Sequence, residues 1–173
     1  MNGYSEYLVT RKKSVLDYAI MLVAAFSGVC STVFIFPFLF AQLYGMFAFL
    51  AIAAIWYVIY IIIRSRTVEY EYCVTETVLD VDVITGKQKR KSFVSVDLKN
   101  ADIIAPATVE YEQQFNKQGF VNKYMASMCD NNVLDFFVIY YDEKNNLCRL
   151  VFTPNQSVLD MIRKANPRNT FFE

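Results

Sequence analysis

The chain has 173 residues, of which 55% are hydrophobic, and its 17 Lys and Arg residues balance its 17 Asp and Glu residues. It contains no histidine, which excludes mixed Cys/His zinc sites and any mechanism that needs a histidine base. The part beyond residue 66 lacks the broad excess of Lys and Arg that phosphate contacts require, so nucleic acid is not an expected partner.

Residues 18–63 form an almost continuous apolar run in which no position carries a charge. At about 1.5 Å of rise per residue, one helix of this length would be roughly twice as long as the ~30 Å hydrocarbon core, so the run must reverse. Pro37 and the segment 41–43 supply a break, which predicts spans over about 18–40 and 44–63. The length of the first span, and the second apolar helix behind it, argue against a cleaved signal peptide.

Basic residues flank the run on both sides, and no charge lies in the break; these residues are Arg11, Lys12 and Lys13 before it, and Arg64 and Arg66 after it. Because short basic flanks stay on the cytoplasmic side, we expect a multi-pass protein of the cell membrane with both termini in the cytoplasm. Since no ionisable residue lies deep in the run, a pump, a transporter or a voltage sensor is not expected.

Small side chains recur at spacings of three or four on one face of each span. They are Ala24, Gly28 and Ser31 in the first span and Gly45, Ala48 and Ala51 in the second. Helices in lipid associate through close packing, so these residues predict a helix–helix contact. The contact could lie within the hairpin, in a homo-oligomer or with another membrane protein.

After Arg66 the apolar period changes to two, which indicates β-strands. Strands are expected at about 70–74, 79–83 and 94–98, with a hairpin turn at Gly86 and a short strand in 99–104. Further strands are expected at about 123–129, 134–141 and 147–152 in an antiparallel meander, with turns at 130–132 and 142–146. Residues 107–122 fit either a strand or a helix. Pro154 is suited to the first position of a final amphipathic helix, which ends at Asn166 and Pro167.

Six or seven antiparallel strands followed by one helix is the element order of pleckstrin-homology-like (PH-like) domains. The segment Tyr72–Glu76 with Leu79, the Gly86 turn and the basic strand start Lys87–Lys91 resemble the first hairpin of bacterial PH-like domains, which commonly follow a two-helix membrane hairpin. The resemblance covers about residues 70–165. It implies an α+β membrane protein in which residues 1–66 form a transmembrane hairpin with basic cytoplasmic flanks. Residues 67–173 would form an antiparallel open β-barrel with one C-terminal helix.

The strongest local charge feature is the group Lys87, Lys89, Arg90 and Lys91. Near an anionic cytoplasmic leaflet each basic residue contributes on the order of 1 kcal/mol, so this group is a candidate site for a lipid headgroup or a partner. The alternative is a solvated hairpin edge that prevents aggregation.

No motif for catalysis, a metal or a cofactor stands out. Strand alternation explains the pair Asp80 and Asp82, and Ser92 and Ser95 have no histidine base. The four cysteines form no Cys-x-x-Cys pair, so we expect reduced, structural thiols. Many bacterial PH-like families have no characterised activity, and the resemblance implies a non-enzymatic, membrane-anchored binding or scaffold module. The alternative is an accessory or structural subunit of a larger membrane complex.

Overall fold

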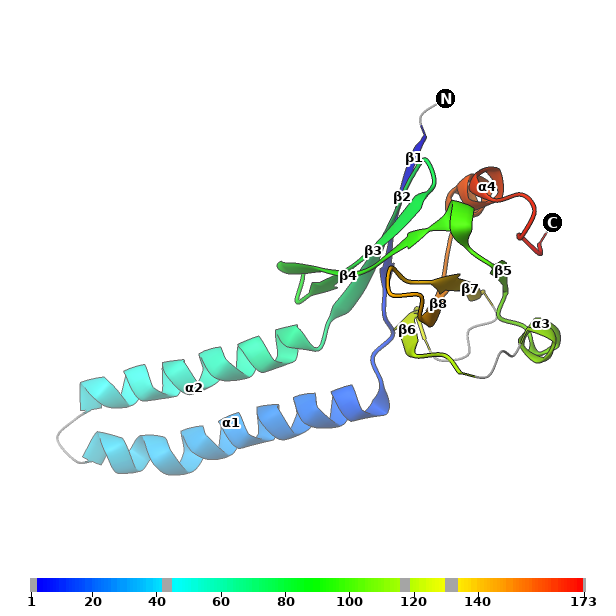
Figure 1. Ribbon diagram of the computed structural model, residues 1–173. Helices are drawn as coiled ribbons and strands as arrows, with labels where there is room; N and C mark the ends of the chain where they lie inside the picture. The colour runs from blue at the N-terminus through cyan, green and yellow to red at the C-terminus, as the bar shows by residue number, and fades with distance from the viewer. Residues whose placement is uncertain (1–2, 42–44, 116–118, 130–133, 173) are drawn as a thin grey trace. The chain divides into compact units, whose positions relative to one another are not determined.

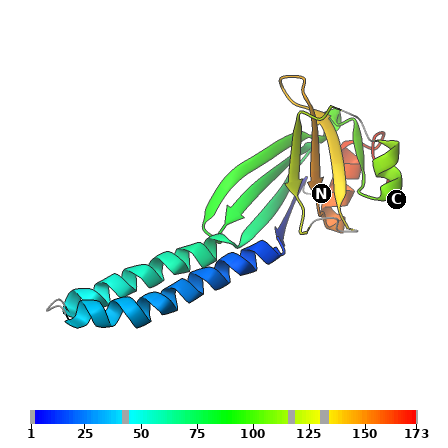
Figure 2. The same ribbon diagram turned by 90° about the horizontal axis from the view of Figure 1, so that it is seen from below.

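The computed structural model describes residues 3–41, 45–115, 119–129 and 134–172. The chain divides into two compact units (Figures 1 and 2). One unit, Lys13–Thr67, is helical, and the other combines Met1–Lys12 with Val68–Glu173. The division shows that residues 3–12 belong with the strands rather than with the helices.

The helical unit consists of α1 (Val15–Ala41) and α2 (Gly45–Ser65). The backbone N–H of Ser14 donates to the Asp17 carboxylate at 3.0 Å, which caps the start of α1. Pro37 lies inside α1 and does not end it. The predicted reversal falls largely on residues 42–44, which lie outside the described residues. Both helices are long and apolar enough to cross a membrane, and only 11% of each apolar window is buried.

The first sheet contains four strands in the order β1-β2-β3-β4, all antiparallel: β1 (Tyr4–Thr10), β2 (Val68–Thr75), β3 (Val78–Thr85) and β4 (Lys89–Asp97). The strands predicted at about 70–74, 79–83 and 94–98 are confirmed as β2, β3 and β4. The first part of the short strand expected in 99–104 is instead a 3₁₀ helix, Leu98–Asn100. Gly86 and Lys87 both have positive φ angles, 61° and 59°, and the Gln88 N–H donates to the Thr85 carbonyl at 3.3 Å, so the predicted turn at Gly86 is confirmed.

Strand β1 was not predicted, because residues 4–10 were included in the flank of the hairpin. The side chains of Ser5, Tyr7 and Val9 alternate toward the core, and Val9 is buried. This strand pairs with β2 over seven residues, from Tyr4 opposite Thr75 to Thr10 opposite Glu69.

The second sheet has the order β5-β7-β8-β6, with strands β5 (Ile103–Pro106), β6 (Asn122–Ala126), β7 (Phe136–Tyr141) and β8 (Leu147–Phe152). Contrary to the predicted antiparallel meander, β6 runs parallel to β8. The predicted barrel is also corrected, because the two sheets do not close: within the described residues, β4 and β6 are sheet edges. The undecided region contains the short helix α3 (Val109–Gln114). The predicted turn at 130–132 lies outside the described residues.

The main core lies between the two sheets and is closed by α4 (Gln156–Ala165), which confirms the predicted final helix. Asn155 rather than Pro154 defines its start, since the Asn155 side chain accepts from the Val158 N–H at 2.9 Å. A second, smaller apolar cluster lies on the outer face of the second sheet, around Phe137, Ile139 and Val151.

Tyr72 joins the two sheets across the main core. Its hydroxyl donates to the Ala126 carbonyl and accepts from the Thr153 N–H at 3.3 Å. Burial raises the pKa of the Tyr72 hydroxyl, because the phenolate would lose its hydration.

Candidate functional site

Strand alternation divides the predicted basic group between the two faces of the first sheet. Lys91 lies opposite Val83, which packs against the main core, and Lys89 shares that face. Arg90 points to the other face. The group therefore does not form one continuous cationic patch.

Carboxylates of β2 and β3 neutralise part of this group. Arg90 pairs with Glu71, and its Nε lies 3.7 Å from the Asp82 carboxylate. Lys87 Nζ lies 4.0 Å from the Glu69 carboxylate. Lys89 and Lys91 are exposed, and neither makes an ion pair with another described residue.

The small residues of the helices lie at different depths. Ala24, Gly28 and Ala48 are buried, whereas Ser31, Gly45 and Ala51 are half-buried. A Cβ atom added to Gly28 would lie 2.6 Å from Cδ1 of Ile59, so α1 and α2 approach closely at this glycine. The contact lies within one hairpin, which is one of the three uses that the spacing left open.

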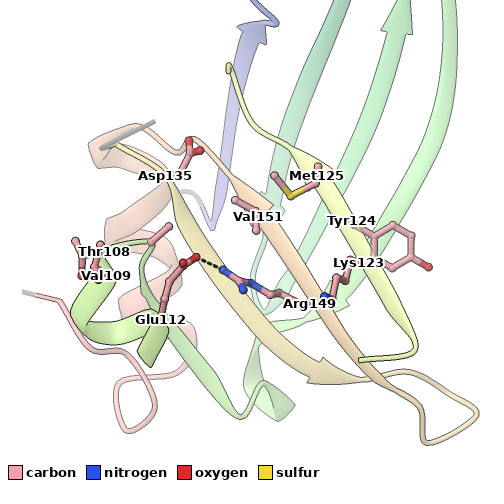
Figure 3. A pocket seen from close by; sticks show the side chains of 10 residues that line it. Thr108, Val109, Glu112, Lys123, Tyr124, Met125, Asp135, Arg149 and Val151 are labelled. Carbon is pink, nitrogen blue, oxygen red and sulfur yellow. Dashed lines mark hydrogen bonds and ion pairs between the residues drawn. The ribbon is translucent and has the colours of Figure 1, made fainter. Parts of the chain in front are cut away.

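A cleft of about 760 Å³ lies on the outer face of the second sheet, where sequence analysis had singled out no site (Figure 3). Three elements build it: α3 on one side, the edge strand β6 on the other, and β8 between them. Its lining includes Val109 and Glu112 from α3, Lys123 and Met125 from β6, and Arg149 and Val151 from β8. The parallel register places Lys123 beside Arg149 and Met125 beside Val151.

Arg149 is the central polar residue of the cleft, and its side chain is only 22% exposed. Its Nη2 pairs with the Glu112 carboxylate, and its guanidinium carbon lies 4.9 Å from the centroid of the Phe137 ring. Its Nε is buried and has no hydrogen-bond partner among the described residues. Lys123 is exposed, with Nζ 5.8 Å from the centroid of the Phe120 ring.

Asp135 lies at the opposite end of the cleft from Lys123 and is 2% exposed (Figure 3). Its two carboxylate oxygens accept hydrogen bonds from the hydroxyls of Ser127 and Thr153, each at 2.6 Å. Thr153 also accepts from the Met128 N–H at 3.0 Å. The Asp135 carboxylate therefore ties the ends of β6 and β8 together, and both its oxygens have partners.

The signal for Arg149 was a lone charge in the apolar strand Leu147–Phe152. Its neighbour Lys123 could not be found from spacing, since the two residues meet only through the parallel pairing of β6 with β8. No group of three or more Cys, Asp or Glu side chains is arranged to hold a metal in the described part of the chain.

One family model, described as "Bacterial PH-like domain (DUF6106)", matches residues 1–172. The match spans β1, both long helices and the two sheets. No curated protein and no solved structure matches the chain.

Proposed function

Because the chain belongs to the family of bacterial PH-like domains, we propose that it is a non-enzymatic binding or scaffold module, anchored in the cell membrane by a two-helix hairpin. The PH-like domain would lie in the cytoplasm. A binding role is supported by the family and by the cleft on the second sheet, whose volume of about 760 Å³ is suited to a small ligand.

The observation that carries the proposal is the place of the hairpin in the chain. Strand β1 precedes α1 and β2 follows α2, yet the two strands are neighbours in one sheet. Where the strands meet the hairpin, the Arg11 N–H donates to the Val68 carbonyl at 2.9 Å. Because the hairpin leaves and re-enters the sheet at this one point, both of its ends must lie on the same side of a membrane that it crosses.

The composition of the helices supports a membrane location. Their apolar windows have mean hydropathies of 2.3 and 2.6, and most of this surface is exposed. Soluble monomers rarely expose contiguous apolar patches of such extent. In a bilayer these apolar side chains would contact lipid chains instead of water, so their exposure would carry no hydrophobic cost.

The basic flanks support the cytoplasmic side. Arg11, Lys12 and Lys13 precede α1, and Arg64 and Arg66 lie at and beyond the end of α2. Short loops rich in Lys and Arg remain in the cytoplasm during insertion. The buried small residues are already used within one hairpin, so they give the accessory-subunit alternative no separate support.

Protease protection tests this topology. A recognition site for a specific protease is inserted into the β7–β8 turn at 142–146 or, as a control, between α1 and α2. In spheroplasts we expect cleavage of the control only, and cleavage of both after permeabilisation. Cleavage of the β7–β8 turn in sealed spheroplasts would contradict the proposal.

A further inference from the structure

We propose that the cleft on the second sheet binds a small amphipathic oxyanion. Its carboxylate or phosphate group would lie between Lys123 and Arg149, and its apolar part would lie against Val109, Met125 and Val151. The inference rests on the proposed binding function, and it names the site and the ligand chemistry.

Two cationic side chains lie next to each other in the cleft. Lys123 and Arg149 are directly opposite each other on neighbouring parallel strands and share one face of the sheet. Like charges in this arrangement repel each other. Glu112 neutralises Arg149, whereas Lys123 makes no ion pair with any described residue. An oxyanion placed between the two side chains would interact favourably with both.

The guanidinium group of Arg149 has a donor edge that an oxyanion can use. Its Nε and Nη2 lie on the same edge, the fork that binds a carboxylate or a phosphate with two parallel hydrogen bonds. Glu112 pairs with Nη2, and Nε is buried without an acceptor among the described residues. A buried donor without a partner is costly, so an acceptor that reaches this edge gains affinity. The guanidinium group also makes a cation–π contact with the Phe137 ring, whose centroid lies 4.9 Å from the guanidinium carbon.

The two carboxylates of the cleft, Asp135 and Glu112, differ in whether they compete with an anionic ligand. Asp135 already accepts two hydrogen bonds and lies at the opposite end of the cleft from Lys123 (Figure 3). Glu112 competes with the ligand for Arg149, and its side chain is 46% exposed on the short helix α3, so it can turn into solvent. Removal of its charge therefore strengthens ligand binding.

The apolar walls define the rest of the ligand. Val109 and Met125 are 71% and 48% exposed and line the cleft together with Val151, which lies beside Met125 in the sheet and belongs to the apolar cluster of this face. A short alkyl chain or a ring would cover these side chains. Neither a bare inorganic anion nor an uncharged apolar molecule uses both halves of the cleft.

Isothermal titration of the full chain in phosphatidylcholine nanodiscs, corrected with empty nanodiscs, tests the site. The probes are hexyl phosphate and hexanoate, compared with inorganic phosphate and hexanol. We expect saturable binding of at least one amphipathic anion, about tenfold tighter than that of either control compound. Absence of saturable binding of both anions up to about 1 mM would overturn the proposal.

Three variants locate the binding. Lys123 is exposed on an edge strand, so Lys123→Met should leave the fold unchanged and weaken binding about tenfold, as should Arg149→Gln. Glu112→Gln should strengthen it, which a merely structural effect would not. Lys164→Met, on the exposed face of α4, is the control for loss of one positive charge. Equal affinities of wild type and Lys123→Met would overturn the proposal.

A second set of nanodiscs, with phosphatidylglycerol, distinguishes the sources of the anion. Weaker apparent binding of the probe there would identify headgroups of the same bilayer as competitors for the site, and unchanged binding would support a soluble ligand. Protease protection is also measured on the wild-type chain. If the wild-type chain binds neither anionic probe while its topology is intact, only the site is overturned, whereas cleavage of the β7–β8 turn in sealed spheroplasts overturns the proposed function itself.

Discussion

Replacing the whole hairpin by a two-residue turn should convert this protein into a folded, water-soluble domain. The register pairs Thr10 with Glu69, and the Arg11 N–H bonds to the Val68 carbonyl, so Arg11 and Val68 are already positioned to flank a tight turn. If Asn-Gly replaces residues 12–67, β1 and β2 become an ordinary hairpin with a type I′ turn. The apolar surface of the two helices is removed at the same time.

A chain that begins at Thr67 is the matched comparison, because it lacks β1. Burial of a side chain the size of Val9 stabilises by about 1.5–3 kcal/mol, and each net hydrogen bond of the ladder adds about 1 kcal/mol. For a strand that pairs over seven residues, the loss is about 5 kcal/mol or more. This approaches the total stability of a small domain, about 5–15 kcal/mol, so the truncated chain should be unfolded or nearly so.

Urea denaturation followed by far-ultraviolet circular dichroism compares the two chains, with size-exclusion chromatography to establish that each is monomeric. We expect a cooperative transition for the turn-linked chain and little or none for the chain that begins at Thr67. Equal stabilities would refute the assignment of β1 to the domain.

Two further predictions use the turn-linked chain. Tyr72→Phe removes the hydroxyl that bonds to the Ala126 carbonyl and leaves buried backbone groups without a partner, so it should lower the free energy of unfolding by about 1–3 kcal/mol. The control Tyr141→Phe, at an exposed position, should lower it little. Equal losses in the two variants would contradict the role of the Tyr72 hydroxyl. Hydrogen bonds from the backbone N–H and the side-chain amide of Asn146 lower the pKa of Asp142 in the folded protein. The ionised Asp142 carboxylate therefore stabilises the fold above its unfolded pKa of about 4, and this stabilisation is lost as the pH falls through the lower folded pKa. Wild type should therefore lose more stability on acidification than Asp142→Asn, and parallel pH profiles would contradict the assignment.

The helices and most strands were predictable because their signals are local. A charge-free run of lipid-spanning length specifies α1 and α2 to within a few residues, and alternation specifies β2, β3 and β8. Strand β1 was missed for two reasons. It carries a serine at an inward position, and its partner strand lies beyond the hairpin, so neither its pattern nor its neighbours in the sequence indicate a sheet. The parallel pairing of β6 with β8 is equally non-local.

The basic group at 87–91 and the cleft around Arg149 also differ in how far the sequence alone could predict them. Lys89, Arg90 and Lys91 are consecutive, but successive residues of a strand face opposite sides, and the pairing of Arg90 with Glu71 depends on a strand that precedes it. Lys123 and Arg149, by contrast, are distant in sequence and adjacent in the sheet. Charge runs within strands should therefore be divided by face before they are interpreted as patches.

If the hairpin interrupts one continuous sheet, β1 and β2 lie close enough for a disulfide to join them in the membrane-bound protein. Glu6 lies opposite Cys73 at a position between hydrogen-bonded pairs, where Cα atoms are about 4.5 Å apart and within disulfide range. The test uses Glu6→Cys in a chain whose other cysteines are alanine, with a protease site between α1 and α2. Thr10→Cys is the control, since position 10 lies about 13 Å further along the same face.

After mild oxidation of native membranes and cleavage between the helices, we expect the two fragments of the Glu6→Cys protein to stay joined on non-reducing gels. Those of the Thr10→Cys protein should separate. Separation of the fragments in both proteins would contradict the pairing of β1 with β2, and with it the placement of both hairpin ends on one side of the membrane.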